Sequence, residues 1–181
     1  MTNLLHSHAL AGAQNAARMT VDGGAYTYNN VKQWTGSGVA GKSNYINIFA
    51  TSHVVVPINI VSNHWLVAII FPQLRSIAIY DSLEGSYRAH NDRVYKLLLQ
   101  YIKDEHLDKL KTPLPNTSEW HRVYPACTLQ PNGNDCGVCS LANTDHVLLG
   151  ELPAYAPVQL STIRRYILLT CLKGTLELPQ A

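Results

Sequence analysis

The chain has 181 residues, a formal net charge of +2 and a charged share of 14%. This length is enough for one domain with a substantial core, and the near balance of charge does not predict nucleic acid or a membrane surface as a partner. The longest uncharged apolar run, residues 65–71, is far too short to cross a bilayer. Residues 11–13 resemble a signal cleavage site but lack the positive and apolar regions of a signal peptide, so we expect no export signal.

Four cysteines crowd into the last third of the chain without the spacing of a disulfide framework: Cys127, Cys136, Cys139 and Cys171. Because no export signal is expected, free thiols in a reducing compartment are favoured over disulfides. We therefore expect an intracellular protein, cytoplasmic or nuclear.

A P-loop pattern, G-x-x-x-x-G-K-[ST], spans residues 36–43, and residues 77–81 read as an apolar strand ending in an aspartate that could hold Mg²⁺. A P-loop needs a strand before it and a helix after it. Residues 30–35 make a poor strand, and residues 44–49 alternate as a strand does. We therefore favour an ordinary glycine-rich loop and keep a nucleotide hydrolase as an alternative.

Three segments rich in β-branched residues predict neighbouring strands: residues 54–60, 64–71 and 76–81. Pro57 places the first strand at a sheet edge or at a bulge. Residues 72–75 have the length of a hairpin loop. If the flanking strands pair symmetrically about this loop, Ala68 lies opposite Ile77 and His64 lies opposite Asp81. Opposed Cβ atoms are about 5 Å apart, so Asp81 would hydrogen-bond one nitrogen of the His64 ring.

The other elements follow from turn signals and apolar periodicity. Residues 1–33 are poorly defined, with a short helix expected from Leu4 to Met19; later segments predict a helix over residues 89–103, a polar loop over 104–119, a short strand over 120–124, a helix from Cys136 that Gly150 ends, and a last helix over about 161–172. Ile163, Ile167 and Cys171 share one face of that last helix.

Residues 130–137, Gln-Pro-Asn-Gly-Asn-Asp-Cys-Gly, place Cys136 between a polar turn and an apolar helix. A thiol at a helix N-terminus meets unpaired N–H groups and the positive end of the helix dipole, which favour the thiolate. Cys136 as nucleophile, His64 as general base and Asp81 as the residue that orients the base would form a catalytic triad. Gln130 and the Cys136 backbone N–H would form the oxyanion hole. Such a site implies acyl transfer through a thioester, with neither metal nor other cofactor.

The spacing of Cys136 and Cys139 also fits the C-x-x-C pattern of thioredoxin-like and zinc sites. Zinc would need a second matching pair, and Cys127, His121 and His146 are irregularly spaced. A redox pair would need a preceding βαβ unit, which the sequence does not predict. Both readings remain open but are less favoured.

Three segments together resemble the ubiquitin-like-protein-specific cysteine proteases, the Ulp/sentrin-protease group: residues 56–65, residues 80–82 and residues 130–137. The resemblance implies an α+β, papain-like cysteine protease fold, in which a central mixed β-sheet is flanked by helices and the nucleophile begins a helix. It covers about residues 34–149 and, more loosely, the rest up to the C-terminus; together with the chain length, this predicts one cysteine protease domain over residues 1–181. It also implies the triad His64, Asp81 and Cys136, with Gln130 as oxyanion donor, and it makes Trp65 a wall of a narrow tunnel for a modifier's Gly-Gly tail.

The implied activity is hydrolysis of the peptide or isopeptide bond after the C-terminal Gly-Gly of a ubiquitin-like modifier, with SUMO the first choice. The implied partners are that modifier and its conjugates, and we expect a monomer. The chain departs from the family in two ways: it lacks the Trp-Leu-Asn-Asp-like segment before His64, Trp34 standing in a different context, and it has Cys139 where an aromatic is common. A deubiquitinase, a deneddylase, an acetyltransferase with the same triad and a silent modifier-binding module remain alternatives.

Overall fold

The computed structural model describes residues 26–36, 44–60, 63–83 and 88–173. The helix predicted from Leu4 to Met19 and most of the P-loop pattern lie outside these ranges. The strands are β1 (Val54–Ile60), β2 (His64–Phe71), β3 (Ser76–Tyr80) and β4 (His121–Val123), and the helices are α2 (Arg88–Leu110), α3 (Cys136–Leu148) and α4 (Leu160–Lys173). Short 3-10 turns connect them, among them η2 (Ile48–Ala50) and η3 (Pro72–Leu74).

One four-stranded sheet has the order β1-β2-β3-β4. The first three strands are antiparallel and β4 runs parallel to β3, so the predicted mixed sheet is confirmed. β1 is an edge strand, and Pro57 is accommodated there because a proline nitrogen has no hydrogen to donate to a ladder.

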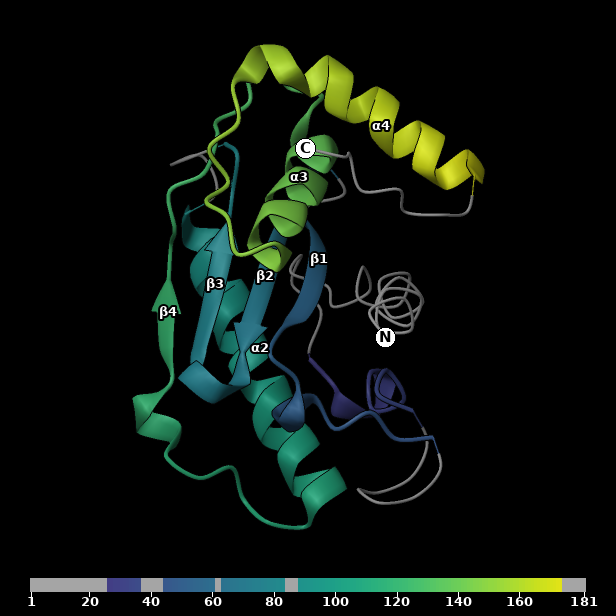
Figure 1. Cartoon of the computed structure of the whole chain (residues 1–181). Helices are drawn as coiled ribbons and strands as arrows, with labels where there is room; N and C mark the ends of the chain where they lie inside the picture. Colours follow the sequence, from purple (N-terminus) through teal and green to yellow (C-terminus); the bar gives the residue numbers. More distant parts are fainter. Residues whose placement is uncertain (1–25, 37–43, 61–62, 84–87, 174–181) are drawn as a thin grey trace.

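Helices cover both faces of the sheet, with α3 in front of it and α2 behind it in Figure 1. Since side chains alternate along a strand, even-numbered residues of β2 pack toward α2 and odd-numbered residues toward α3. Leu66 and Ala68 thus share a buried cluster with Val94 and Leu98 of α2. Val67 and Ile69 lie in another cluster, which Val147 of α3 partly covers. Burial on both sides explains why β2 reads as a continuous apolar run.

The hairpin between β2 and β3 has a different register from the predicted one. Ala68 lies opposite Ile79, two residues from the expected Ile77. The turn explains the error: residues 72–74 form η3, and Arg75 follows in the left-handed region with φ of 50°. Because the slip is by two residues, every side chain keeps its predicted face. His64 and Asp81 are therefore diagonal rather than opposite neighbours.

The segment before β1 packs on the second half of α2. The strand-like reading of residues 44–49 is wrong, because Asn47 accepts a hydrogen bond from the Phe49 N–H (3.1 Å) and the chain turns into η2. The predicted end of α2 is also too early. The helix continues to Leu110 because its polar residues face this segment: Glu105 is fully buried and accepts a hydrogen bond from the Tyr28 hydroxyl (2.6 Å).

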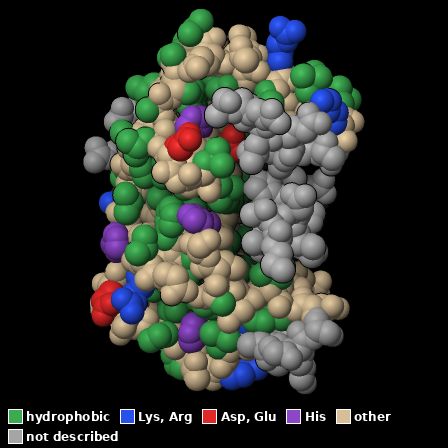
Figure 2. Space-filling view, in the orientation of Figure 1, with side chains coloured by type: hydrophobic (Ala, Val, Ile, Leu, Met, Phe, Trp, Pro, Cys, Tyr) green, Lys and Arg blue, Asp and Glu red, His purple; other side chains and the backbone are tan. Residues whose placement is uncertain are grey.

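The two last predicted helices are confirmed as α3 and α4, and Gly150 follows α3 with a positive φ of 77°. Ile163 and Ile167 pack α4 against α3, whereas Cys171, one turn further along the same helix, is exposed. Figure 2 shows charged side chains scattered among apolar and uncharged ones on the face that it displays. Within the described residues, no helix is both long and apolar enough to cross a membrane.

Candidate active site

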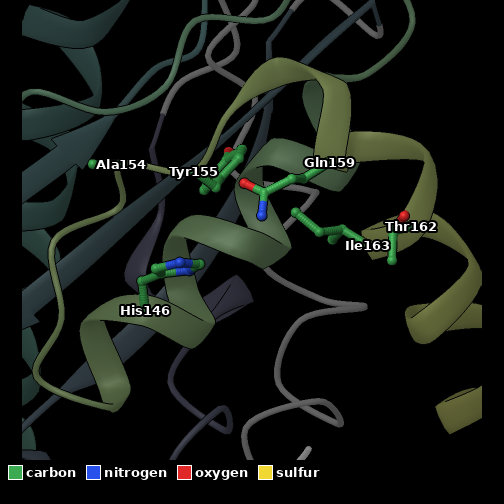
Figure 3. A pocket seen from close by; sticks show the side chains of 6 residues that line it. All are labelled: His146, Ala154, Tyr155, Gln159, Thr162 and Ile163. Carbon is green, nitrogen blue, oxygen red and sulfur yellow. The ribbon is translucent and has the colours of Figure 1, made fainter. Parts of the chain in front are cut away.

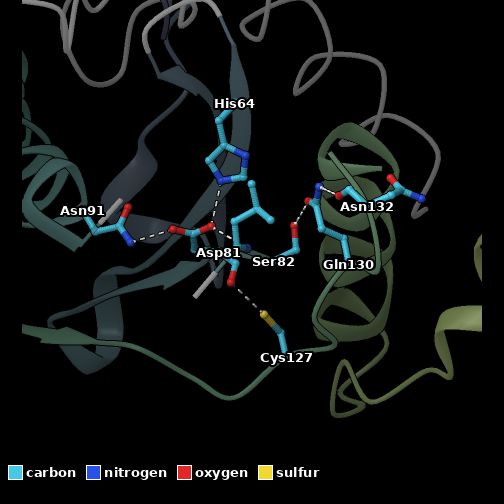
Figure 4. Close-up of polar contacts among 8 residues, drawn as sticks. His64, Asp81, Ser82, Asn91, Cys127, Gln130 and Asn132 are labelled. Carbon is cyan, nitrogen blue, oxygen red and sulfur yellow. Dashed lines mark hydrogen bonds and ion pairs between the residues drawn. The ribbon is translucent and has the colours of Figure 1, made fainter. Parts of the chain in front are cut away.

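His64 begins β2 and Asp81 follows β3, so the antiparallel pairing brings both to the same end of the sheet. The His64 Nε2 atom lies 2.7 Å from Asp81 Oδ1, and both side chains are almost completely buried (Figure 4). The diagonal contact replaces the directly opposed pair that the sequence predicts, with the same chemical result. A carboxylate only accepts hydrogen bonds, so the Nε2 atom of the neutral ring carries the hydrogen and Nδ1 is its basic nitrogen.

Asp81 is held from three sides. Its Oδ2 accepts from Asn91 Nδ2 (2.9 Å) on α2, and its Oδ1 also accepts from the Leu83 backbone N–H (3.0 Å). Burial by itself raises the pKa of this carboxyl, but the hydrogen bonds from His64, Asn91 and Leu83 outweigh burial and lower the pKa below its ordinary value. Stability from these bonds is therefore present above the ordinary pKa and is lost as the pH falls through the folded value.

Cys136 is the first residue of α3, with its side chain buried. The start of this helix meets the start of β2, because a Cβ placed on Gly137 would lie 4.0 Å from Trp65 Cδ1. Trp65 neighbours His64 in the strand but points to the opposite face, and it stays 38% exposed. The sheet end that carries His64 and Asp81 thus also carries the N-terminus of α3.

Gln130 is joined to the residue after Asp81. Its backbone N–H donates to the Ser82 carbonyl (3.0 Å), and its Oε1 accepts from the Ser82 hydroxyl (2.7 Å). Its Nε2 donates to the Asn132 carbonyl. Figure 4 shows Asp81 and Ser82 between His64 and Gln130.

The sequence prediction missed three residues that surround Asp81. Asn91 donates to the Asp81 carboxylate, and Ser82 follows Asp81 and donates to Gln130. The Cys127 thiol donates to the Asp81 carbonyl (3.6 Å). Burial and the nearby Asp81 carboxylate raise the pKa of Cys127 to about 11, so this thiol stays protonated and remains a donor. Strand alternation places Ser82 on the opposite face from Asp81, and this pattern could have predicted that Ser82 lies on the side of α3. Nothing in the sequence marks Asn91 or Cys127, because their partner is distant along the chain.

The metal and nucleotide readings find little support among the described residues. No group of three or more His, Cys, Asp or Glu side chains that could hold a metal ion occurs there, and all four cysteines are free thiols. Asp81 is bonded to His64 and Asn91. Gly36 has a packing reason for its identity: its φ is +93°, and an added Cβ would lie 1.6 Å from the Asn44 carbonyl oxygen.

A cavity of about 480 Å³ lies between the second half of α3 and the start of α4 (Figure 3). Its lining residues are His146, Ala154, Tyr155, Gln159, Thr162 and Ile163. The His146 Nδ1 atom lies 2.8 Å from the Ala142 carbonyl, and the Tyr155 hydroxyl donates to Asn143 Oδ1 (3.0 Å), so these polar groups are engaged within the protein. None of the lining residues belongs to the group around His64 and Asp81.

A helix-initiating cysteine, a histidine–aspartate pair and a glutamine at the same end of a mixed sheet define the α+β, papain-like cysteine protease class. Residues 2–155 match the Ulp1 protease family, C-terminal catalytic domain, and the chain belongs to this family. It is 28% identical over 141 residues to sentrin-specific protease 2 of Homo sapiens. The matched region covers 76% of this chain and 22% of that protein. The chain thus spans about a fifth of the length of this relative.

Two solved structures show the same fold. The Ulp1 protease domain in complex with Smt3, the yeast orthologue of SUMO, has a TM-score of 0.68 at 22% identity, covering 88% of this chain and 64% of that one. The Ulp1-like SUMO protease catalytic domain of Chaetomium thermophilum has a TM-score of 0.61 at 31% identity, covering 72% of this chain and 49% of that one.

Proposed function

We propose that this chain is the catalytic domain of a thiol protease that hydrolyses the peptide or isopeptide bond after the C-terminal Gly-Gly of a ubiquitin-like modifier, SUMO first among them. The observation that carries the proposal is the buried His64–Asp81 hydrogen bond of 2.7 Å at the sheet end where α3 begins with Cys136. Membership of the Ulp1 protease family and the relatives named as SUMO proteases support it.

In the proposed reaction, the Cys136 sulfur attacks the carbonyl carbon of the modifier's last glycine while its proton resides on His64 Nδ1. The carbonyl oxygen becomes an oxyanion, which the Gln130 amide and the Cys136 backbone N–H stabilise. As the C–N bond breaks, His64 returns the proton to the leaving amine and a thioester remains. Water, deprotonated by His64, then attacks the thioester and releases the modifier's carboxylate. Asp81 fixes the His64 tautomer throughout.

Trp65 is proposed as one wall of the passage for the Gly-Gly tail, since it is half-exposed beside the residue that follows Cys136. Trp34 does not supply the opposite wall: its ring packs on Tyr101 of α2, with centroids 5.6 Å apart. The proposal further takes residues 1–181 as a single protease domain that works as a monomer inside the cell. The four free thiols support a reducing compartment.

Cleavage assays test this function. SUMO extended beyond its Gly-Gly and SUMO joined to a lysine should both be cut after the second glycine by wild-type protein and not by Cys136→Ala. Other ubiquitin-like modifiers, assayed in parallel, should be cut more slowly. If ubiquitin is cleaved faster than SUMO, the protein is a deubiquitinase and SUMO is not its preferred substrate. If SUMO binds but is not cleaved, the protein is a modifier-binding module. Transfer of acetyl groups from acetyl-coenzyme A would indicate the acetyltransferase alternative.

A further inference from the structure

Asp81 and Ser82 are consecutive residues that serve opposite faces of the sheet. Alternation continues past the end of β3, because Ile79 belongs to the cluster on the α2 face and Tyr80 to the cluster on the α3 face. Asp81 accordingly contacts Asn91 of α2, whereas Ser82 meets Gln130 beside α3. The residue that orients the proposed base is therefore adjacent in sequence to the residue that holds the proposed oxyanion donor.

The contact between Ser82 and Gln130 is double and buried. The backbone of Gln130 donates to the backbone of Ser82 (3.0 Å), and the Ser82 hydroxyl lies 2.7 Å from Gln130 Oε1. The two residues are 3% and 8% exposed. The backbone bond fixes where the Gln130 Cα lies, and the side-chain bond fixes where its amide points.

The orientation of the Gln130 amide follows from its partners. A backbone carbonyl only accepts hydrogen bonds, so the Gln130 atom that faces the Asn132 carbonyl must be the NH₂ group. The other amide atom is then the oxygen, and the Ser82 hydroxyl must donate to it. The NH₂ group has a second hydrogen beyond the one given to Asn132, and that hydrogen is the one an oxyanion would accept.

We propose that Ser82 is a positioning residue for catalysis: its hydroxyl fixes the rotation of the Gln130 amide so that the second Nε2 hydrogen faces the oxyanion formed at Cys136. This inference rests on the proposed function, since it deepens the role of the same site. Without the hydroxyl, the buried Oε1 loses its donor, and the amide turns to find another partner. The backbone bond between the two residues is unaffected by such a change.

Kinetics with Ser82→Ala test the proposal, using SUMO that carries a fluorophore amide after Gly-Gly. Outright loss of an oxyanion donor costs about 10²- to 10³-fold in kcat, so we expect Gln130→Ala to fall in that range and Ser82→Ala to lose roughly ten- to a hundred-fold. KM should change little, because the lost interaction belongs to the transition state. In the Gln130→Ala background, Ser82→Ala should cause no further loss.

A second readout separates positioning from general damage to the site. Alkylation of Cys136 by iodoacetamide displaces iodide from a saturated carbon and forms no oxyanion, so its rate, followed by peptide mass mapping, should be equal in wild type and Ser82→Ala. Ser76→Ala is the matched control, since it removes another buried hydroxyl from the far end of β3 and should retain wild-type kinetics.

Three results would overturn the inference: wild-type kinetics in Ser82→Ala, a parallel loss of alkylation rate, or independent losses that multiply in the double variant. Failure of wild-type protein to cleave the substrate at all would instead overturn the proposed function, and the role of Ser82 with it.

Discussion

Asp81 has two roles: it accepts a hydrogen bond within a turn, and it binds a histidine. One oxygen, Oδ1, accepts from both the Leu83 backbone N–H and His64 Nε2. The turn therefore fixes the carboxylate in the place from which it orients the imidazole. Because the same oxygen serves both contacts, the turn holds Asp81 Oδ1 2.7 Å from His64 Nε2.

Removing the Asp81 carboxylate should separate its catalytic role from its structural one. We expect Asp81→Ala to lower kcat by about 10²- to 10⁴-fold, because the His64 tautomer is no longer fixed. The kcat of Asp81→Asn should lie between that of Asp81→Ala and that of wild type. The new side-chain oxygen can still accept a hydrogen bond from His64 once the Asn91 amide turns its oxygen toward the new NH₂ group. Asp92→Asn, on the exposed surface of α2, is the control, and wild-type turnover in Asp81→Ala would contradict the assignment.

Trp65 should act on substrate binding rather than on the thiol. Truncation of an aromatic anchor costs about 2 kcal/mol or more, so Trp65→Ala should raise KM for a SUMO substrate at least tenfold. Iodoacetamide should alkylate Cys136 at the wild-type rate in this variant, and Trp65→Phe should restore part of the affinity. An unchanged KM would remove Trp65 from the tail-binding wall.

At the scale of elements, the sequence predicts the three long strands well because burial on one or both faces leaves a clear apolar pattern. It misses the hairpin register because a 3-10 turn followed by a left-handed arginine has no marked signature. It also wrongly predicts a strand over residues 44–49. The residues alternate as in a strand, but they pair with no strand of the sheet and lead into a 3-10 turn that Asn47 caps. The sequence also predicts the contact between His64 and Asp81, but the contacts that support Asp81 depend on three-dimensional pairing.

Gly36 should be required by packing rather than by phosphate binding. An alanine there would need a φ of +93° and would clash with the Asn44 carbonyl, so we expect Gly36→Ala to destabilise the fold by about 1–3 kcal/mol. Urea unfolding measures this difference. Gly133→Ala is the matched control, because an added Cβ there meets nothing within 4 Å. Full stability of Gly36→Ala would contradict the close approach.

Glu105 should make the attachment of the N-terminal segment to α2 dependent on pH. Burial raises its pKa above the ordinary 4.5, although hydrogen bonds from Thr35 and Tyr28 and the charge of Lys109 oppose the shift. The folded protein then holds this proton more tightly than the unfolded chain, so stability falls as the pH rises from 4.5 through the folded pKa. Glu105→Gln should flatten this part of the stability profile in urea titrations, and an unchanged slope would contradict the prediction. Asp108, whose lowered pKa lies below 3.8, does not titrate in this window.

At the scale of the molecule, the described residues form a sheet between α2 and α3, with α4 packed on α3 and the proposed chemistry at one end of the sheet (Figure 1). β2 brings His64 and Trp65, the end of β3 brings Asp81 and Ser82, and α3 brings Cys136. Strand alternation assigns the residues from β2 and β3 to their faces, and Cys136 is placed by the start of α3.

The most direct test of this account is the intact mass of the protein after reaction with SUMO bearing a C-terminal vinyl sulfone. Wild-type protein should gain the mass of one probe, and so should Cys139→Ala, which removes the neighbouring thiol three residues along α3. Cys136→Ala should gain none. Labelling that persists in Cys136→Ala, or a wild-type protein that remains unlabelled, would contradict the central claim that Cys136 is the nucleophile of a SUMO-type protease.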